Sequence, residues 1–190
     1  MKPAPPFTVC VYCGARDGRD PAYAAAAEDV GRLLSARGWR LVYGAGDVGL
    51  MGRVAAAHAA GQGSAMGVIP RHLLGAERNG RAGGDVVVTE TMHERKKVML
   101  MNADAVLLLP GGAGSMDELF EALTWRQLGL HDKPILVLDV AGYWTPLLAL
   151  IRHVVDHGFA DRTLLDYVRP VDGIDTLEAA LSDAASGRGL

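Results

Sequence analysis

A glycine-rich segment near the middle of the chain has the composition of an anion-binding loop. Residues 110–115 read Pro-Gly-Gly-Ala-Gly-Ser, follow the apolar run 105–109 and precede an expected helix. Backbone N–H groups at a helix start can surround a phosphate group, helped by the positive end of the helix dipole. The segment lacks the Gly-Lys-Ser/Thr ending of a nucleoside-triphosphate P-loop. A single phosphate group on a smaller ligand therefore fits this loop better.

An acidic residue, Glu118, follows this loop and admits two interpretations. Ser115 and Glu118 have the S-x-x-E spacing of a capping box, in which the glutamate only bonds back to the first main-chain amides of the helix. Alternatively, the Glu118 carboxylate points across a bound ligand, where it can act as a general base or stabilise positive charge. The spacing alone leaves both interpretations open.

Two consecutive cations, Arg95 and Lys96, form a second candidate site. Thr91 and Glu94 also have capping-box spacing, which places both cations about one turn into a helix. Cations near a helix N-terminus oppose the helix dipole, so an anionic ligand is a simple reason for their presence. The alternative is a solvated basic patch on an exposed helix.

A second glycine loop, residues 44–49, matches the G-x-G-x-x-G pattern of dinucleotide-binding proteins and offers Gly44 and Gly46 as ligand contacts. However, it does not follow the first expected strand, and the acidic residue that would bind a ribose is missing. Arg71 is suited to the 2′-phosphate of NADP, which keeps an NADP-dependent oxidoreductase as a minor alternative. We expect no cofactor.

Two further pairs of residues resemble metal or redox motifs. Cys10 and Cys13 form a C-x-x-C within a buried strand pattern, with no second cysteine pair to complete a zinc site. Strand positions three apart point to opposite faces, so we expect two reduced core thiols. His153 and His157 lack an obvious third ligand, and we expect histidines at the surface or at a helix end. We therefore predict no metal site.

Short apolar runs alternate with longer helical patterns almost throughout the chain. Strands rich in Val, Ile and Leu without polar alternation are typical of a sheet covered on both faces. We therefore predict a Rossmann-like, doubly wound parallel α/β sheet of about seven strands with helices on both faces, whose ligand lies beyond the carboxyl ends of the strands. The expected strands are 8–12, 40–43, 65–69, 86–89, 105–109, 135–138 and 167–171, and the expected helices are 21–37, 49–60, 92–101, 116–128, 143–157 and 176–186.

The composition excludes several classes of protein. The 190 residues carry 19 Lys and Arg against 22 Asp and Glu, a net charge of −3, so no basic excess is available to neutralise a nucleic-acid backbone, which argues against nucleic-acid binding. No apolar stretch approaches the ~20 residues of a membrane helix, and the first residues lack a signal-peptide pattern. We expect a single cytoplasmic domain over residues 1–190, with frayed tails at 1–6 and 186–190.

Taken together, these segments resemble the LOG (LONELY GUY) family, long mislabelled as lysine decarboxylases. The combination of Met-His-Glu-Arg-Lys with Pro-Gly-Gly-x-Gly is more specific than either glycine loop alone. The chain departs from the usual pattern at Ser115, which replaces a Thr, and at Ala113 and Ala45, which replace a Tyr and a Gly. The matching segments are 10–14, 43–46, 49–52, 92–96, 110–115 with Glu118, 124–129, 133–134 and 142–143.

The resemblance implies a homodimer that hydrolyses a nucleoside 5′-monophosphate, AMP or isopentenyl-AMP, to a free base and ribose 5-phosphate. It implies that Arg95 and Glu118 are catalytic. A non-catalytic nucleotide or molybdenum-cofactor carrier on the same fold is the alternative. The residues expected to contact substrate, from the resemblance and from the glycine loops together, are Gly44, Gly46, Glu77, Lys96, Gly111, Gly112, Ala113, Gly114, Ser115, Met116, Asp117 and Thr124.

Overall fold

The computed structural model describes residues 5–77 and 85–187 of the chain. Within these residues, seven parallel strands form one sheet in the order β4-β3-β2-β1-β5-β6-β7. The strands are β1 (Thr8–Tyr12), β2 (Arg40–Tyr43), β3 (Ala65–Pro70), β4 (Asp85–Thr89), β5 (Ala105–Leu108), β6 (Ile135–Leu138) and β7 (Val168–Val171).

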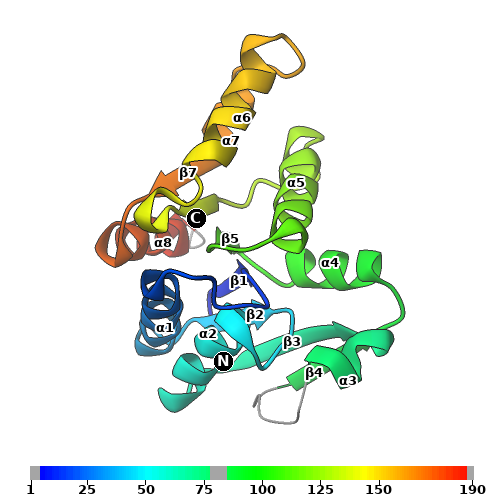
Figure 1. Ribbon diagram of the computed structural model, residues 1–190, viewed down its shortest axis with the longest axis vertical. Helices are drawn as coiled ribbons and strands as arrows, with labels where there is room; N and C mark the ends of the chain where they lie inside the picture. The colour runs from blue at the N-terminus through cyan, green and yellow to red at the C-terminus, as the bar shows by residue number, and fades with distance from the viewer. Residues whose placement is uncertain (1–4, 78–84, 188–190) are drawn as a thin grey trace.

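Helices cover both faces of this sheet (Figure 1). Figure 1 shows α1 and α8 on one side of the sheet and α4 and α5 on the other, while α6 and α7 project from the rest of the molecule. The α-helices are α1 (Pro21–Ala36), α2 (Gly49–Ala60), α3 (Leu74–Glu77), α4 (Met92–Met101), α5 (Ala113–Gln127), α6 (Thr145–Asp156), α7 (Thr163–Tyr167) and α8 (Ile174–Gly187). The predicted doubly wound α/β fold is confirmed.

The first strand divides its side chains between two hydrophobic cores. Val9 and Val11, with Cys13 just after the strand, pack under α1, α2 and α8, whereas Cys10 and Tyr12 pack on the opposite face under α4, α5 and α6. Both cysteines are buried free thiols, as the alternation of strand side chains predicts. Apolar burial on both faces is the reason that the strands read as continuous hydrophobic runs.

Local signals define where several helices begin. Asp20 caps α1 by accepting a hydrogen bond from the Ala22 amide over 2.8 Å, and Pro21 takes the first helical position, where no amide donor is needed. The predicted capping box of α4 is also confirmed, because Thr91 and Glu94 bond each other's main-chain amides.

The structure corrects several boundaries that the sequence pattern misplaced, among them the start of α8, which lies at Ile174 rather than at 176. Helix α5 begins at Ala113 rather than at 116, and α6 begins at Thr145 rather than at 143, which leaves Tyr143 in the preceding turn. The predicted start of the C-terminal tail at residue 186 is also wrong, because α8 continues to Gly187. None of the described helices is long and apolar enough to cross a membrane.

Candidate active site at the switch point of the sheet

The candidate active site lies where the winding of the sheet reverses. Strands β1 and β5 are neighbours, and the chain leaves their carboxyl ends toward opposite faces of the sheet. Such a switch point is where ligands bind in open α/β sheets. A cavity of about 470 Å³ opens here, lined by the loop after β1, by the 110–115 loop and by side chains from α4 and α5. Its volume is in the range of small-molecule sites.

Two glycines let the loops after β1 and β5 meet main chain to main chain. The Gly14 amide donates to the Pro110 carbonyl over 2.9 Å. A Cβ atom at Gly111 would lie 3.0 Å from the Gly14 nitrogen and 2.1 Å from the Ser115 hydroxyl oxygen. A side chain at Gly111 would therefore force the loops apart, so this position requires glycine for close packing.

The start of α5 excludes the capping-box interpretation of Glu118. Gly112 is the N-cap residue and makes no side-chain cap, and Ser115 lies buried inside the first turn. Ser115 therefore cannot be the cap that the S-x-x-E spacing suggested, and the capping-box alternative is wrong. Glu118 instead lies in the second turn, half-buried, and lines the cavity together with Gly112, Gly114 and Ser115.

Arg95 lies buried in the cavity wall, so the alternative of a solvated basic patch is also wrong. Only 4% of its surface is exposed. Its guanidinium donates hydrogen bonds to two main-chain carbonyls of neighbouring strands, to Gly44 just after β2 over 2.7 Å and to Val68 in β3 over 3.1 Å. These bonds hold the guanidinium in a fixed position on the wall of the cavity that Glu118 also lines.

Gly44 has a different role from the one its G-x-G-x-x-G pattern suggests. A Cβ atom at this position would lie 2.1 Å from a terminal nitrogen of Arg95. The glycine therefore makes room for the Arg95 guanidinium as well as lining the cavity. Arg71, the residue considered for NADP, forms an ion pair with Glu90 and is not part of the cavity lining, which removes the geometric support for that alternative.

The buried thiol of Cys13 lies within the electrostatic influence of both charged residues. Burial raises the pKa of Cys13, the negative charge of Glu118 raises it further, and the positive charge of Arg95 lowers it. The thiol is therefore neutral near pH 7, and it contributes an uncharged surface to the cavity.

Lys96 is engaged in ion pairs between helices rather than exposed in the cavity. Its ammonium group lies 2.9 Å from an oxygen of Asp117 and 2.9 Å from an oxygen of Glu121, which joins α4 to α5. Desolvation lowers the pKa of Lys96, but its hydrogen bonds to the two carboxylates outweigh this effect, and the net pKa is raised.

The structure brings only part of the predicted set of residues into the cavity. Gly44, Arg95, Gly111, Gly112, Gly114, Ser115 and Glu118 line it. Of the other expected contacts, the following described residues are not in its lining: Gly46, Lys96, Ala113, Met116, Asp117 and Thr124. The Thr124 hydroxyl donates to the Phe120 carbonyl of its own helix. The side chain of Glu77 lies outside the part of the chain that the structure describes.

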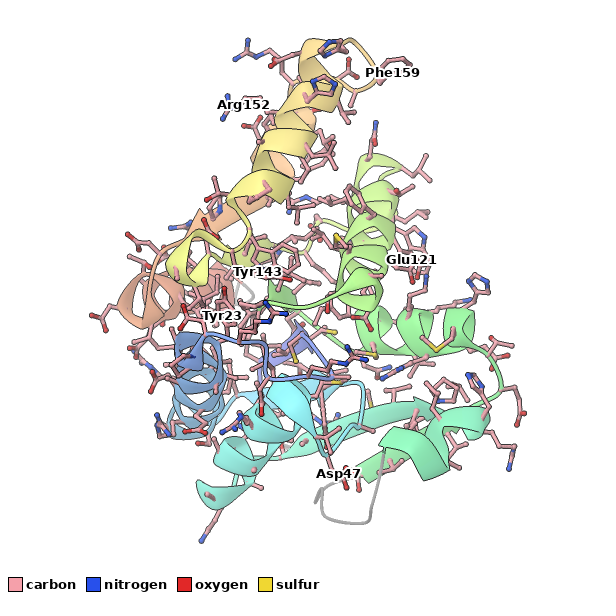
Figure 2. The ribbon with its side chains drawn as sticks, viewed as in Figure 1. Tyr23, Asp47, Glu121, Tyr143, Arg152 and Phe159 are labelled. Atoms are coloured by element: carbon pink, nitrogen blue, oxygen red, sulfur yellow. The ribbon has the colours of Figure 1, made fainter. Side chains whose placement is uncertain are left out.

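Two tyrosines that were not among the expected site residues, Tyr23 and Tyr143, also line the cavity. Tyr143 donates a hydrogen bond from its hydroxyl to the Gly111 carbonyl over 2.5 Å, and its ring contacts the ring of Tyr23 edge to face, with centroids 5.3 Å apart. Figure 2 shows these side chains reaching one another from separate elements. No local spacing connects residues so far apart, and only the match at 142–143 marked Tyr143 at all.

The fold and this cavity define a class: doubly wound α/β proteins with a glycine-rich, helix-starting loop at the switch point. Comparisons with known proteins narrow the class. The family described as "Possible lysine decarboxylase" matches residues 51–181. Because close relatives also cover most of the chain, the protein belongs to this family, the LOG family.

Two curated plant relatives illustrate the similarity. The chain is 42% identical over 182 residues to the probable cytokinin riboside 5′-monophosphate phosphoribohydrolase LOG4 of Oryza sativa subsp. japonica, covering 96% of this chain and 79% of that protein. It is 46% identical over 152 residues to the cytokinin riboside 5′-monophosphate phosphoribohydrolase LOG5 of Arabidopsis thaliana, covering 80% of this chain and 66% of that protein.

Solved structures support the fold at lower sequence similarity. The molybdenum cofactor carrier protein of Chlamydomonas reinhardtii superposes with a TM-score of 0.74 at 18% identity, covering 96% of this chain and 99% of the other. The molybdenum cofactor binding protein of Rippkaea orientalis gives a TM-score of 0.69 at 17% identity, covering 95% and 98%. At these identities the likeness shows a shared fold and carries no functional conclusion.

Proposed function

We propose that this protein hydrolyses the N-glycosidic bond of adenosine-type nucleoside 5′-monophosphates and releases the free base and ribose 5-phosphate. The observation that carries the proposal is that one cavity is lined by the Glu118 carboxylate, the Arg95 guanidinium and the glycine-rich start of α5. The curated relatives described above are named for this activity on cytokinin riboside 5′-monophosphates.

The start of α5 is the proposed phosphate site. The first amides of a helix lack main-chain partners within the helix, and no side chain caps them here. Gly112, Gly114 and Ser115 therefore offer main-chain donors along the cavity wall, at the positive end of the helix dipole. Binding the phosphate at this end fixes the position of the sugar relative to the second turn of α5, where Glu118 lies.

Glu118 is the proposed base and electrostatic partner of the sugar. As the base departs, positive charge builds on C1′ of the ribose, and a carboxylate beside it stabilises that charge. Glu118 also accepts a proton from the attacking water, whose oxygen bonds to C1′ while the bond from C1′ to the base nitrogen breaks. The departing base takes up a proton from solvent and leaves neutral, and Glu118 returns the proton it accepted to solvent. General-base assistance contributes about 10²- to 10⁴-fold, and positioning and electrostatics supply the rest.

Arg95 is the proposed electrostatic partner of the reaction. Its two carbonyl bonds fix the guanidinium on the cavity wall before any ligand arrives, so little reorganisation is needed during the reaction. A cation in this position suits the electron-rich atoms of the nucleotide.

Product analysis tests this proposal directly. The protein is incubated with AMP, with isopentenyladenosine monophosphate and with adenosine, and the free base and ribose 5-phosphate are measured. We expect release from both monophosphates and very little from adenosine, because the phosphate positions the sugar. Equal turnover of AMP and adenosine would contradict the phosphate-anchored mechanism, and tight AMP binding without any product would favour a carrier. The two monophosphates compared side by side give the base preference.

The family resemblance also leads us to propose a homodimer. Helix α5 supports this, because Met116 and Phe120, four residues apart and on the same face of the helix, are both more than one-third exposed. Sedimentation equilibrium tests the proposal. We expect the native chain to sediment as a dimer and Phe120→Glu to shift it toward monomer, with Leu150→Glu on the exposed face of α6 as the matched control.

A further inference from the structure

The loop between β1 and α1 contributes a second arginine, Arg16, to the cavity. Arg16 is exposed, whereas Arg95 is buried, and both line the same space. The two cations therefore lie at different depths, with Arg16 toward the solvent and Arg95 in the wall. Figure 1 shows the loop after β1 beside the segment that leads from β5 into α5.

The main chain of Arg16 is close to the proposed phosphate loop. A Cβ atom at Gly14 would lie 3.0 Å from the Arg16 carbonyl oxygen and 3.4 Å from the Gly111 Cα. The main chain of Arg16 and the glycine-rich segment before α5 therefore both lie next to Gly14. An arginine side chain is long enough to extend from this position over the neighbouring loop.

The loop that carries Arg16 is held in place from the side of α2. Gly49, the first residue of α2, has a φ of +61°. A Cβ atom there would lie 2.4 Å from the Arg16 nitrogen and 2.3 Å from the Ala15 carbonyl carbon. The Met51 amide also donates to the Gly14 carbonyl over 3.3 Å. The backbone of Arg16 is thus fixed by close contacts, so its side chain starts from a defined point at the cavity mouth.

The charge of Arg16 is not neutralised by the acidic residue beside it. The carboxylate of Asp17 accepts two hydrogen bonds from Arg53, over 2.7 Å and 3.1 Å. In the described part of the chain, no carboxylate forms an ion pair with Arg16. The other two cations near the site already have protein partners. Arg95 donates hydrogen bonds to two main-chain carbonyls, and Lys96 forms ion pairs with two carboxylates.

We propose that Arg16 binds the phosphate group of the substrate from the solvent side of the cavity, opposite the main-chain amides of α5, and so selects nucleotides over nucleosides. This inference rests on the proposed function for its substrate class. A guanidinium matches phosphate oxygens in a two-point, charge-assisted geometry, which main-chain amides alone do not provide. Arg16 adds a positive charge on the solvent side of the phosphate, where the start of α5 offers only main-chain dipoles.

The test compares Arg16→Gln with Arg19→Gln, which removes an exposed arginine from the same loop that is not in the cavity lining. We expect Arg16→Gln to raise KM for AMP by about 10- to 100-fold, as for loss of a charged hydrogen bond. The kcat should change little, since the contact is made in the ground state and in the transition state. Inhibition by ribose 5-phosphate should weaken in parallel. The KM of Arg16→Lys for AMP should lie between those of the native protein and of Arg16→Gln. The KM of Arg19→Gln should match that of the native protein.

Direct binding separates this inference from the proposed function. Titration calorimetry with AMP, with adenosine and with inorganic phosphate measures the contact in proteins that also carry Glu118→Gln, in which turnover is strongly reduced. If the native protein binds AMP but produces no free base, the hydrolase proposal fails, while weaker AMP binding by Arg16→Gln still supports the phosphate contact. If Arg16→Gln and Arg19→Gln give the same KM, the same ribose 5-phosphate inhibition and the same AMP affinity, the inference is overturned. Equal loss of AMP and adenosine affinity would also overturn it, because the contact would not be to phosphate.

Discussion

The guanidinium of Arg95 occupies the space that a side chain at residue 44 would need. Its terminal nitrogen donates to the Gly44 carbonyl over 2.7 Å and would lie 2.1 Å from a Cβ atom added to Gly44. The glycine loop after β2 and the paired cations of α4, which read as separate motifs in the sequence, are therefore parts of one arrangement. Glycine is required at residue 44 because a side chain there would collide with the Arg95 guanidinium.

The substitution Gly44→Ala tests this relationship. The added methyl group should displace the Arg95 guanidinium, and displacement of a positioned group by about 1 Å can cost on the order of 100-fold in rate. We therefore expect kcat/KM for AMP to fall by about 100-fold while the protein remains folded. Steady-state kinetics and circular dichroism measure the two effects.

The matched control is Gly46→Ala in the same loop. A Cβ atom at Gly46 would lie 3.3 Å from the terminal methyl group of Met51, a flexible side chain that can adjust. We expect activity close to that of the native protein. Equal losses for both variants would mean that the loop as a whole, rather than the space for Arg95, is what the activity requires.

The substitution Glu118→Gln separates a catalytic role from a structural one. Because α5 begins at Ala113 without a side-chain cap, Glu118 is not needed to start the helix. Glutamine keeps the size and hydrogen-bonding capacity of the side chain but removes the charge. We expect kcat for AMP to fall by about 10²- to 10⁴-fold, with a change in unfolding free energy below about 1 kcal/mol. Near-native turnover would show that another group activates the water.

The fold was predictable from the sequence because its determinants are local. The strands are buried on both faces and therefore read as apolar runs, and the predicted bounds of β1, β2 and β6 agree with the structure. The short helices α3 and α7 were not predicted, since helices of this length show no hydrophobic periodicity.

The site was only partly predictable because its remaining determinants are contacts between distant segments. The S-x-x-E pattern of Ser115 and Glu118 is the same whether Ser115 caps the helix or lies inside its first turn, and the glycine cap decides between them. The ion pairs of Lys96 and the bond from Tyr143 to Gly111 cross between elements. Spacing along the chain contains no information on such contacts.

The two cysteines should be protected from thiol reagents in the native protein. Burial raises the pKa of both thiols, and the negative charge of Glu118 raises each further. A raised pKa lowers the fraction of thiolate, which is the reactive form, at any given pH. At pH 8 we therefore expect much slower reaction with a disulfide reagent in the native state than in guanidinium chloride, where both thiols should react. Rapid reaction of one thiol equivalent of the native protein with the reagent would contradict this expectation. The variant Cys13→Ser would then show which of the two thiols had reacted.

The ion pairs of Lys96 should stabilise the contact between α4 and α5. Breaking a buried ion pair can cost 3–5 kcal/mol, but Asp117 is 60% exposed and Glu121 21%, so solvent screening reduces the effect. We expect Lys96→Met, which keeps the aliphatic chain, to lower the free energy of unfolding by about 1–2 kcal/mol. Lys97→Met, which removes the exposed neighbouring cation, should have little effect.

The pH dependence of the same ion pairs gives a second measurement. The pKa of Lys96 is raised in the folded state, so the ion pairs contribute fully below the unfolded-state pKa of about 10.4 and are lost as the pH rises through the folded-state value. The stability difference between the native protein and Lys96→Met should therefore be constant near neutral pH and shrink above about pH 10.4. If Lys96→Met instead raises KM for AMP with no loss of stability, the lysine contacts the substrate as the family resemblance implies.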